Sequence, residues 1–250
     1  MVSRIRKVLK VNKTRVTERI NLLSKDKNSF RKYVDFYYSN EIFFGPSVYF
    51  HNKVINFVRN SDYEFLLEDE HFIEYVYATL ASWGMHRMGP KGSKMRDFKG
   101  FMESILSNKS LFLKLKKYRL DAVTEQGKRE VFKVLERLFQ NLKIMQSGSN
   151  LVGNSKVIHH LLPDLIPPID RQYTIRFFYG NLTSKYTPPF RKEEETDLFL
   201  DIVRYFGVIC KRLNLTEDDY DKTKSFNTSI PKVIDNAIIG LIQSMKVSSR

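Results

Sequence analysis

The chain has only one cysteine, Cys210, and no apolar run long enough to cross a membrane. A single thiol cannot close an internal disulfide. The first residues, MVSRIRKVLKV, lack the apolar region of about 7–15 residues that a secretory signal has. Lysine or arginine interrupts every apolar run before it reaches the roughly 20 residues of a membrane-spanning helix. These absences predict an intracellular protein, cytoplasmic or nucleoid-associated, with no membrane partner.

The signatures of common cofactor and metal sites are also missing. There is no P-loop, no dinucleotide-binding glycine pattern and no nucleophile elbow. His159 and His160 are adjacent, so on a helix their side chains point about 100° apart and cannot bind one ion together. His71 and Glu74 could share a helix face, but no second such pair exists. We therefore expect no cofactor and no metal site.

Acidic residues are few relative to basic ones: 28 Asp and Glu stand against 42 Lys and Arg, a net charge of +14. The excess is clustered, since residues 1–33 carry eleven basic and two acidic side chains, and residues 84–119 carry ten and two. Residues 191–221 reverse the sign, with nine acidic and five basic side chains. Such clusters bind polyanions, because neutralised phosphates release their counterions. We expect a nucleic-acid partner, DNA before RNA; the alternative is lysine-rich helix faces that are only solvated.

Apolar residues make up 42% of the 250 residues, which is enough for a core and excludes a disordered chain. They recur at steps of three and four, the helical period, whereas the alternation of a strand is scarce. The clearest helices are expected at 129–145, 193–213 and 231–245. Further helices are expected at 4–23, 29–38, 48–58, 70–83, 94–106 and 111–118. The sequence thus predicts an all-α fold of about ten helices in one compact unit, 1–250. The alternative arrangement is two lobes that share a core.

Residues 151–180, LVGNSKVIHHLLPDLIPPIDRQYTIRFFYG, carry the most chemical information. A turn with Gly153 is expected to lead into a short helix at 156–162. Three prolines, at 163, 167 and 168, keep the residues before them out of the helical region, which predicts an extended connection. Asp170 is then a good N-cap for a helix at 171–179.

This order of features resembles the helix-hairpin-helix DNA glycosylase superfamily. In that family a Leu-Pro-Gly-Val-Gly hairpin precedes a catalytic Lys, and a later apolar-Val-Asp-Thr-His run carries the catalytic Asp; here LVGNSK and PPIDRQY stand in those places. The chain departs from the family at three points. Val152 replaces the proline, and only Gly153 remains of the two glycines. Lys156 stands one position later than the family's lysine and is separated from Asp170 by fewer residues than is usual in the family. Cys210 alone cannot hold the iron–sulfur cluster of some members.

The resemblance implies a DNA base-excision glycosylase or lyase with Asp170 and Lys156 as catalytic residues. Asp170 would stabilise the positive charge that develops on the sugar, or activate water or an amine. In the alternative mechanism a desolvated Lys156 amine attacks the sugar carbon and forms a Schiff base. The base must leave the stack, so a pocket is required, with Trp83 and Tyr173 as its expected lining. The residues expected to bind the nucleic acid are Gly153, Asn154, Ser155, Arg87, Lys91, Lys94 and Arg171.

Each assignment has a structural alternative. Asp170 can be a helix cap and nothing else, Lys156 an exposed or phosphate-contacting lysine, and Trp83 part of the core. Asp235 and Asn236 are expected on the polar face of the last helix. The alternative functions are a non-catalytic helical DNA- or RNA-binding protein that uses its basic clusters, and a scaffold that binds another protein through its acidic segment.

Overall fold

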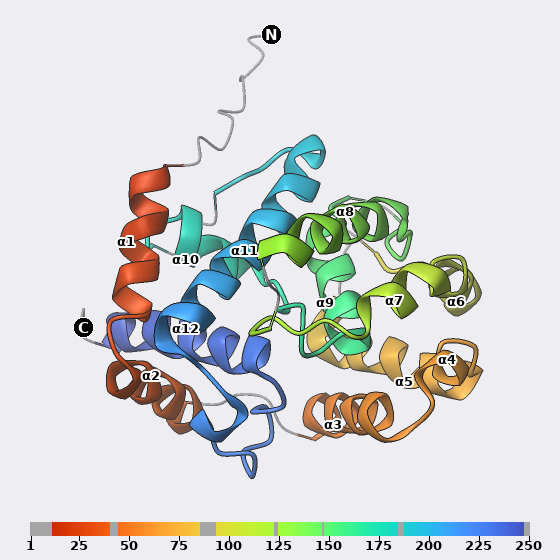
Figure 1. Ribbon diagram of the computed structural model, residues 1–250, viewed down its shortest axis with the longest axis horizontal. Coiled ribbons are helices and arrows are strands. Elements are labelled where there is room, and N and C mark those ends of the chain that lie inside the picture. Colours follow the sequence, from red (N-terminus) through yellow and green to blue (C-terminus); the bar gives the residue numbers. More distant parts are fainter. Residues whose placement is uncertain are drawn as a thin grey trace, which may run out of the picture.

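The fold is all-α, as the sequence predicts. The computed structural model describes residues 12–40, 45–85, 94–122, 125–146, 148–184 and 188–247. These ranges contain twelve α-helices joined by short 3₁₀ and π turns, and their only β pairing is an isolated bridge between Met95 and Met145. In Figure 1, α1, α2, α10 and α12 lie on one side and α3 to α7 on the other, with α8, α9 and α11 between them.

The helices follow the predicted order, with one short addition, α4. Their bounds are α1 Lys13–Leu23, α2 Lys27–Ser39, α3 Pro46–Asn60, α4 Tyr63–Leu66, α5 Glu70–Leu80, α6 Phe98–Leu106, α7 Lys109–Leu115, α8 Glu125–Asn141, α9 Leu151–Leu161, α10 Arg176–Tyr179, α11 Glu195–Leu213 and α12 Ile230–Val247. The π turns η1 (Ala81–Met85) and η2 (Arg171–Ile175) follow α5 and precede α10.

Side-chain caps decide where several helices begin. Asn or Asp precedes five of them and accepts a hydrogen bond from a backbone N–H of the first turn; these residues are Asn12, Asp26, Asp62, Asp69 and Asp97. Each cap satisfies an amide that has no partner within the helix. The predicted helix at 94–106 therefore starts later, at Phe98, because Asp97 caps it and Met95 is held in the bridge to Met145.

The segment around α9 also differs from expectation. The expected turn at Gly153 is helix, because α9 begins at Leu151, two residues before it. Of the residues shortly before α9, Gly148 adopts a positive φ of 73°. The helix predicted at 70–83 ends as α5 at Leu80 and continues as η1, in which Gly84 has a φ of 85°. Of the helix predicted at 4–23, residues 4–11 lie outside the described residues.

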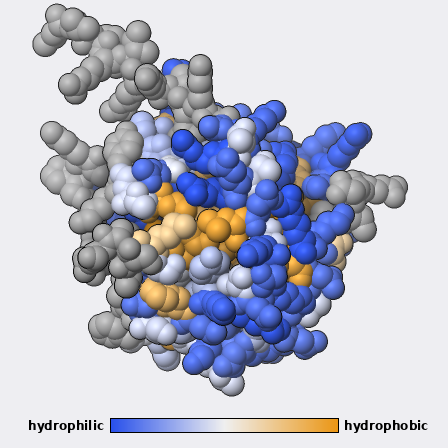
Figure 2. All heavy atoms as spheres, turned by 90° about the vertical axis from the view of Figure 1, so that its left-hand side faces the viewer, coloured by the Kyte–Doolittle hydropathy of each residue, from blue (hydrophilic) through white to orange (hydrophobic). Residues whose placement is uncertain are grey.

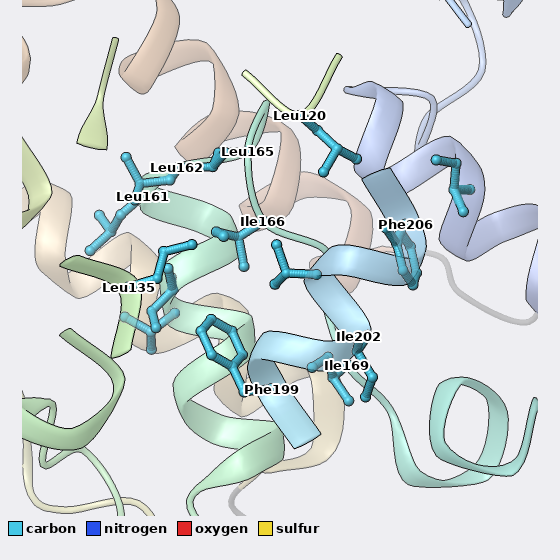
Figure 3. Packing of buried hydrophobic residues seen from close by; sticks show 14 of the residues in the cluster. Leu120, Leu135, Leu161, Leu162, Leu165, Ile166, Ile169, Phe199, Ile202 and Phe206 are labelled. Atoms are coloured by element: carbon cyan, nitrogen blue, oxygen red, sulfur yellow. The ribbon is translucent and has the colours of Figure 1, made fainter. Parts of the chain in front are cut away.

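Helix α9 is the centre of the core. All of its residues except Val152 are buried, and α3, α5 and α11 pack on it. Figure 3 shows how side chains from its end and from the following turn meet α8 and α11. The labelled residues of this cluster are Leu120, Leu135, Leu161, Leu162, Leu165, Ile166, Ile169, Phe199, Ile202 and Phe206.

The face on the α1 side is mainly polar, with an apolar patch framed by polar side chains (Figure 2). Elsewhere, large exposed hydrophobic side chains are scattered along the described chain: Tyr49, Phe65, Leu106 and Val208. Among the described helices, none combines the length and the apolar character that crossing a bilayer requires.

Helices α2 and α12, from opposite ends of the sequence, pack side by side (Figure 1). Their closest approach is at Gly240, where a Cβ would overlap the carbonyl oxygen of Tyr33 and lie 3.0 Å from the amide nitrogen of Tyr37. Both obstacles are backbone atoms, which cannot rotate away. Glycine at 240 is therefore what allows the two helices to approach this closely.

Gly240→Ala should lower the free energy of unfolding by about 1–3 kcal/mol, because the two backbones must separate. Urea unfolding followed by circular dichroism measures the loss. Gly207→Ala is the matched control, since a Cβ there meets only Leu120 Cδ1 at 3.7 Å. That variant should be neutral or stabilised by up to about 1 kcal/mol, as alanine is the better helix former. Equal stability of the two variants would contradict the close helix contact.

Candidate active site

A pocket of about 70 Å³ lies where α2, α9 and α12 meet η1 and the start of η2. It is lined by Tyr37, Trp83, Lys156, Pro168, Asp170, Tyr173, Phe226, Lys232, Asp235 and Ile239. Four residues singled out from the sequence, Lys156, Asp170, Trp83 and Tyr173, thus line one pocket. Lys156, Lys232 and Asp235 are buried, whereas Asp170, Trp83 and Tyr173 are half-buried, so the latter three form the outer part of the pocket.

A larger groove of about 620 Å³ lies between α8 and α11, with Phe132, Val203 and Gly207 in its wall. None of the predicted site residues lines it. Size alone therefore does not identify the site. What distinguishes the smaller pocket is that charged side chains in its lining, those of Lys156, Lys232 and Asp235, are buried.

Lys156 lies in the second turn of α9 with its side chain buried. Its Nζ is 5.3 Å from the centroid of the Trp83 ring, a cation–π distance. Burial lowers the pKa of this amine, and the charges of Asp170 and Asp235 oppose the shift. The amine is thus easier to deprotonate than that of an ordinary lysine, and the expectation of an exposed lysine is wrong.

Asp170 follows the extended stretch that the two prolines enforce and begins η2. Its Oδ1 accepts hydrogen bonds from the backbone N–H groups of Gln172, at 2.6 Å, and Tyr173, at 3.1 Å. The expected N-cap is therefore confirmed. Capping fixes the carboxylate through one oxygen while the residue also lines the pocket, so the structural role and a chemical role are compatible.

Sequence reasoning missed a buried ion pair on α12. Lys232 Nζ donates to Asp235 Oδ2 at 2.8 Å and to Asn236 Oδ1 at 2.6 Å. The prediction that Asp235 and Asn236 form an exposed polar face is wrong, because both are buried. Burial raises the pKa of Asp235, against the influence of Lys232. The available signal was three polar residues at i, i+3 and i+4 inside an apolar helix, a spacing that puts them on one helix face but does not say whether that face is buried.

Three histidines, His51, His159 and His160, are buried, and one of them is hydrogen bonded to the backbone of Lys156. His160 Nδ1 donates to the carbonyl oxygen of Lys156 at 2.7 Å, so its Nε2 accepts from His51 Nδ1 at 3.1 Å. His51 Nε2 then accepts from the hydroxyl of Thr228 at 3.0 Å. His159 Nδ1 donates to the carbonyl of Ile166 at 2.7 Å. Burial lowers the pKa of all three rings, that of His160 to about 4, so they are neutral at pH 7.

The residues predicted to bind nucleic acid fall into three groups. Gly153, Asn154 and Ser155 are buried within α9, and Asn154 Nδ2 donates to the carbonyls of Phe139, at 3.1 Å, and Leu142, at 3.0 Å. This structure gives these three no surface for a phosphate, so that expectation is corrected. Lys94 and Arg171 are exposed and can meet a ligand. Arg87 and Lys91 lie outside the described residues.

The acidic segment neutralises part of the basic clusters. Asp219 pairs with Lys27 at 2.8 Å and with Arg31 at 3.2 Å, and Glu217 pairs with Arg119 at 2.8 Å. Other side chains of the 84–119 cluster are exposed: Lys94, Arg96, Lys99, Lys114 and Lys117. The net charge therefore overstates the cationic surface that a ligand meets, and these exposed groups are its described part in that segment.

Comparison of the chain with protein families, curated proteins and solved structures finds no match.

The three buried histidines should make stability fall between pH 7.5 and pH 5.5. The unfolded chain takes up protons near pH 6.5, whereas the folded rings, with lowered pKa values, do not. The contribution of these rings to the free energy of unfolding is fully present above pH 6.5 and is lost as the pH falls below it. At pH 5.5 the loss is about 1 kcal/mol for each ring. Urea unfolding at both pH values measures the decline.

In the His159→Gln variant the decline in stability should be about a third smaller, because glutamine has no titrating ring. Its side-chain amide can still donate a hydrogen bond to the carbonyl of Ile166. His71→Asn is the control, since the side chain of His71 is 86% exposed, and it should retain the full decline. Stability that is independent of pH over this interval would rule out a neutral buried cluster.

Proposed function

We propose that the protein binds DNA and excises a base through the pocket that contains Lys156 and Asp170, in the manner of a DNA N-glycosylase with lyase activity. The observation that carries the proposal is the meeting of a buried amine and a half-buried carboxylate in one pocket with aromatic walls. A carboxylate and an amine whose pKa is lowered by burial, brought together in a cleft, are typical of catalytic sites.

Asp170 would stabilise the transition state electrostatically. Breaking an N-glycosidic bond leaves positive charge on the sugar, and a fixed carboxylate near that charge lowers the barrier. The two amide hydrogen bonds to Oδ1 hold Asp170 before the substrate arrives. A carboxylate that is already oriented does not have to reorient during the reaction. Avoiding this free-energy cost is a main source of electrostatic catalysis.

Lys156 would act as the nucleophile. Its lone pair forms a bond to the anomeric carbon while the glycosidic bond breaks, and one proton of the resulting ammonium passes to the departing base. The bond between the anomeric carbon and the ring oxygen then breaks, the nitrogen lone pair forms the C=N bond, and the ring oxygen takes a proton from water, which gives a protonated Schiff base. This chemistry requires a neutral amine, and burial lowers the pKa of Lys156 in that direction.

The aromatic residues would hold the extruded base. A ring of benzene size needs roughly 150 Å³, and the pocket has about 70 Å³, so binding a whole base must widen it. Trp83 and Tyr173 are the half-buried aromatic walls, and a shift of either side chain would open the outer part. Arg171, which is exposed and follows Asp170 in the sequence, would contact a flanking phosphate.

One observation favours the second candidate, a non-catalytic DNA- or RNA-binding protein. The hydrogen bonds of Asp170 are those of an ordinary helix cap and need no catalytic explanation. In that case the exposed lysines and arginines would bind phosphates, and the pocket would hold no reacting group. Activity on a modified duplex separates the two candidates.

Asp170→Asn should lower the rate of base excision by at least about 100-fold and leave duplex binding intact. Asparagine is as good an N-cap as aspartate, so the start of η2 is kept while the negative charge is removed. Lys156→Met should prevent trapping of a covalent protein–DNA adduct by borohydride, since the amine is lost and the apolar volume is kept. The assay uses a panel of duplexes, each with one damaged or mismatched base.

Lys114→Met is the matched control, because this exposed lysine of α7 is not part of the pocket lining. It should cleave like the wild type and show only slightly weaker, salt-dependent binding. Binding without cleavage on every duplex would favour the non-catalytic candidate. Absence of both binding and cleavage would exclude a nucleic-acid function for the basic clusters.

A further inference from the structure

The pocket contains a buried hydrogen-bond acceptor that nothing in the described chain satisfies. Asp235 is 4% exposed and lines the pocket, and its Oδ1 has no hydrogen-bond partner. A buried carboxylate oxygen without a donor is costly, because it has lost its hydration and gained nothing in return. A ligand that brings an N–H to this atom would remove that cost.

Lys232 fixes the carboxylate in place. It binds Asp235 through Oδ2, at 2.8 Å, so Oδ1 is the oxygen left for a ligand. The ammonium has three N–H groups, and Asp235 and Asn236 accept two of them. These two acceptors leave one N–H of Lys232 for a ligand, so Lys232 and Asp235 together offer one donor and one acceptor.

The surroundings suit a flat ring. Tyr37, Trp83, Tyr173 and Phe226 line the pocket, and Lys232 Nζ lies 5.2 Å from the Phe226 ring centroid and 5.7 Å from that of Tyr37. Aromatic walls bind planar heterocycles through stacking and edge contacts. A positively charged donor next to an acceptor complements a ring edge with a carbonyl beside an N–H.

We propose that Asp235 and Lys232 recognise the edge of an oxo-base, with Asp235 Oδ1 accepting the ring N–H and Lys232 donating to the adjacent carbonyl oxygen. Bases of this class include uracil, hypoxanthine and guanine. This inference rests on the proposed function, since it assigns the substrate class of the same pocket. Asp235 is a specificity residue here, distinct in role from Asp170 and Lys156.

The test uses small ligands and the wild-type protein, so it needs no variant to fold. Trp83 is the only tryptophan of the chain and lines the pocket, so its fluorescence, excited at the red edge of its absorption, reports occupancy. The probes are 1-methyluracil and 9-methylhypoxanthine, in which a methyl group takes the place of the sugar. Their partners are 1,3-dimethyluracil and 1,9-dimethylhypoxanthine, which lack only the ring N–H.

Each N–H base should bind at least about tenfold more tightly than its methylated partner, because a hydrogen bond to a charged acceptor is lost. The double variant Lys232→Met/Asp235→Leu should remove this difference. Exchanging a whole buried ion pair for apolar groups usually preserves the fold, whereas removing one partner leaves an unpaired charge. Lys114→Met is the control variant and should keep the discrimination, because Lys114 is exposed and is not part of the pocket lining.

Equal affinity for an N–H base and its methylated partner would overturn the inference, as would the absence of any fluorescence change with the four probes. Tighter binding of 9-methyladenine than of 9-methylhypoxanthine would overturn the choice of an oxo-base. The duplex assay remains a separate readout. Cleavage of DNA without discrimination among the probes removes the role of Asp235 and keeps the proposed function, whereas discrimination without cleavage supports base recognition and removes the glycosylase activity.

Discussion

Two ammonium groups, those of Lys156 and Lys232, are buried inside the helical bundle, and the site depends on how their charge is balanced. Lys232 has a direct partner in Asp235 at 2.8 Å and a second acceptor in Asn236. Lys156 faces the ring of Trp83 and is stabilised by the fields of Asp170 and Asp235. Lys232 is therefore held by two direct acceptors, while burial makes Lys156 easier to deprotonate, and the proposed roles of a recognition group and a nucleophile follow from this difference.

The position of Lys156 is set by the backbone beneath it. Helix α9 is surrounded by α3, α5 and α11, so its side chains have little room to move. The carbonyl oxygen of Lys156 accepts from His160, which is held in turn by His51 and Thr228. These rings are neutral near pH 7 because burial lowers their pKa values, so they orient Lys156 without adding positive charge beside it. A network of neutral partners is the arrangement that leaves a buried amine free to change its own protonation state.

Local signals in the sequence predicted much of the fold. The helical period gave the long helices α8, α11 and α12, and the prolines with Asp170 predicted the start of η2, because caps and proline act through neighbouring residues only. Such local signals do not determine long-range packing. Whether Lys232 and Asp235 face water or the core depends on where α2 lies, and nothing near residue 232 encodes that. The Gly153 turn failed for the same reason: tertiary contacts of α9 outweigh the weak helix propensity of one glycine.

The buried charges are poorly explained by stability alone. An isolated pair such as Lys232 and Asp235 gains little over apolar residues of the same volume, because desolvation offsets the attraction of the two charges. Here two lysines and two aspartates line a single pocket, and their formal charges cancel. One carboxylate oxygen, Oδ1 of Asp235, is buried without a hydrogen-bond partner among the described residues, and it lines the pocket. Sites at which a sequence departs from the rules of core packing are commonly functional, and the buried lysines together with this carboxylate oxygen make the pocket one such departure.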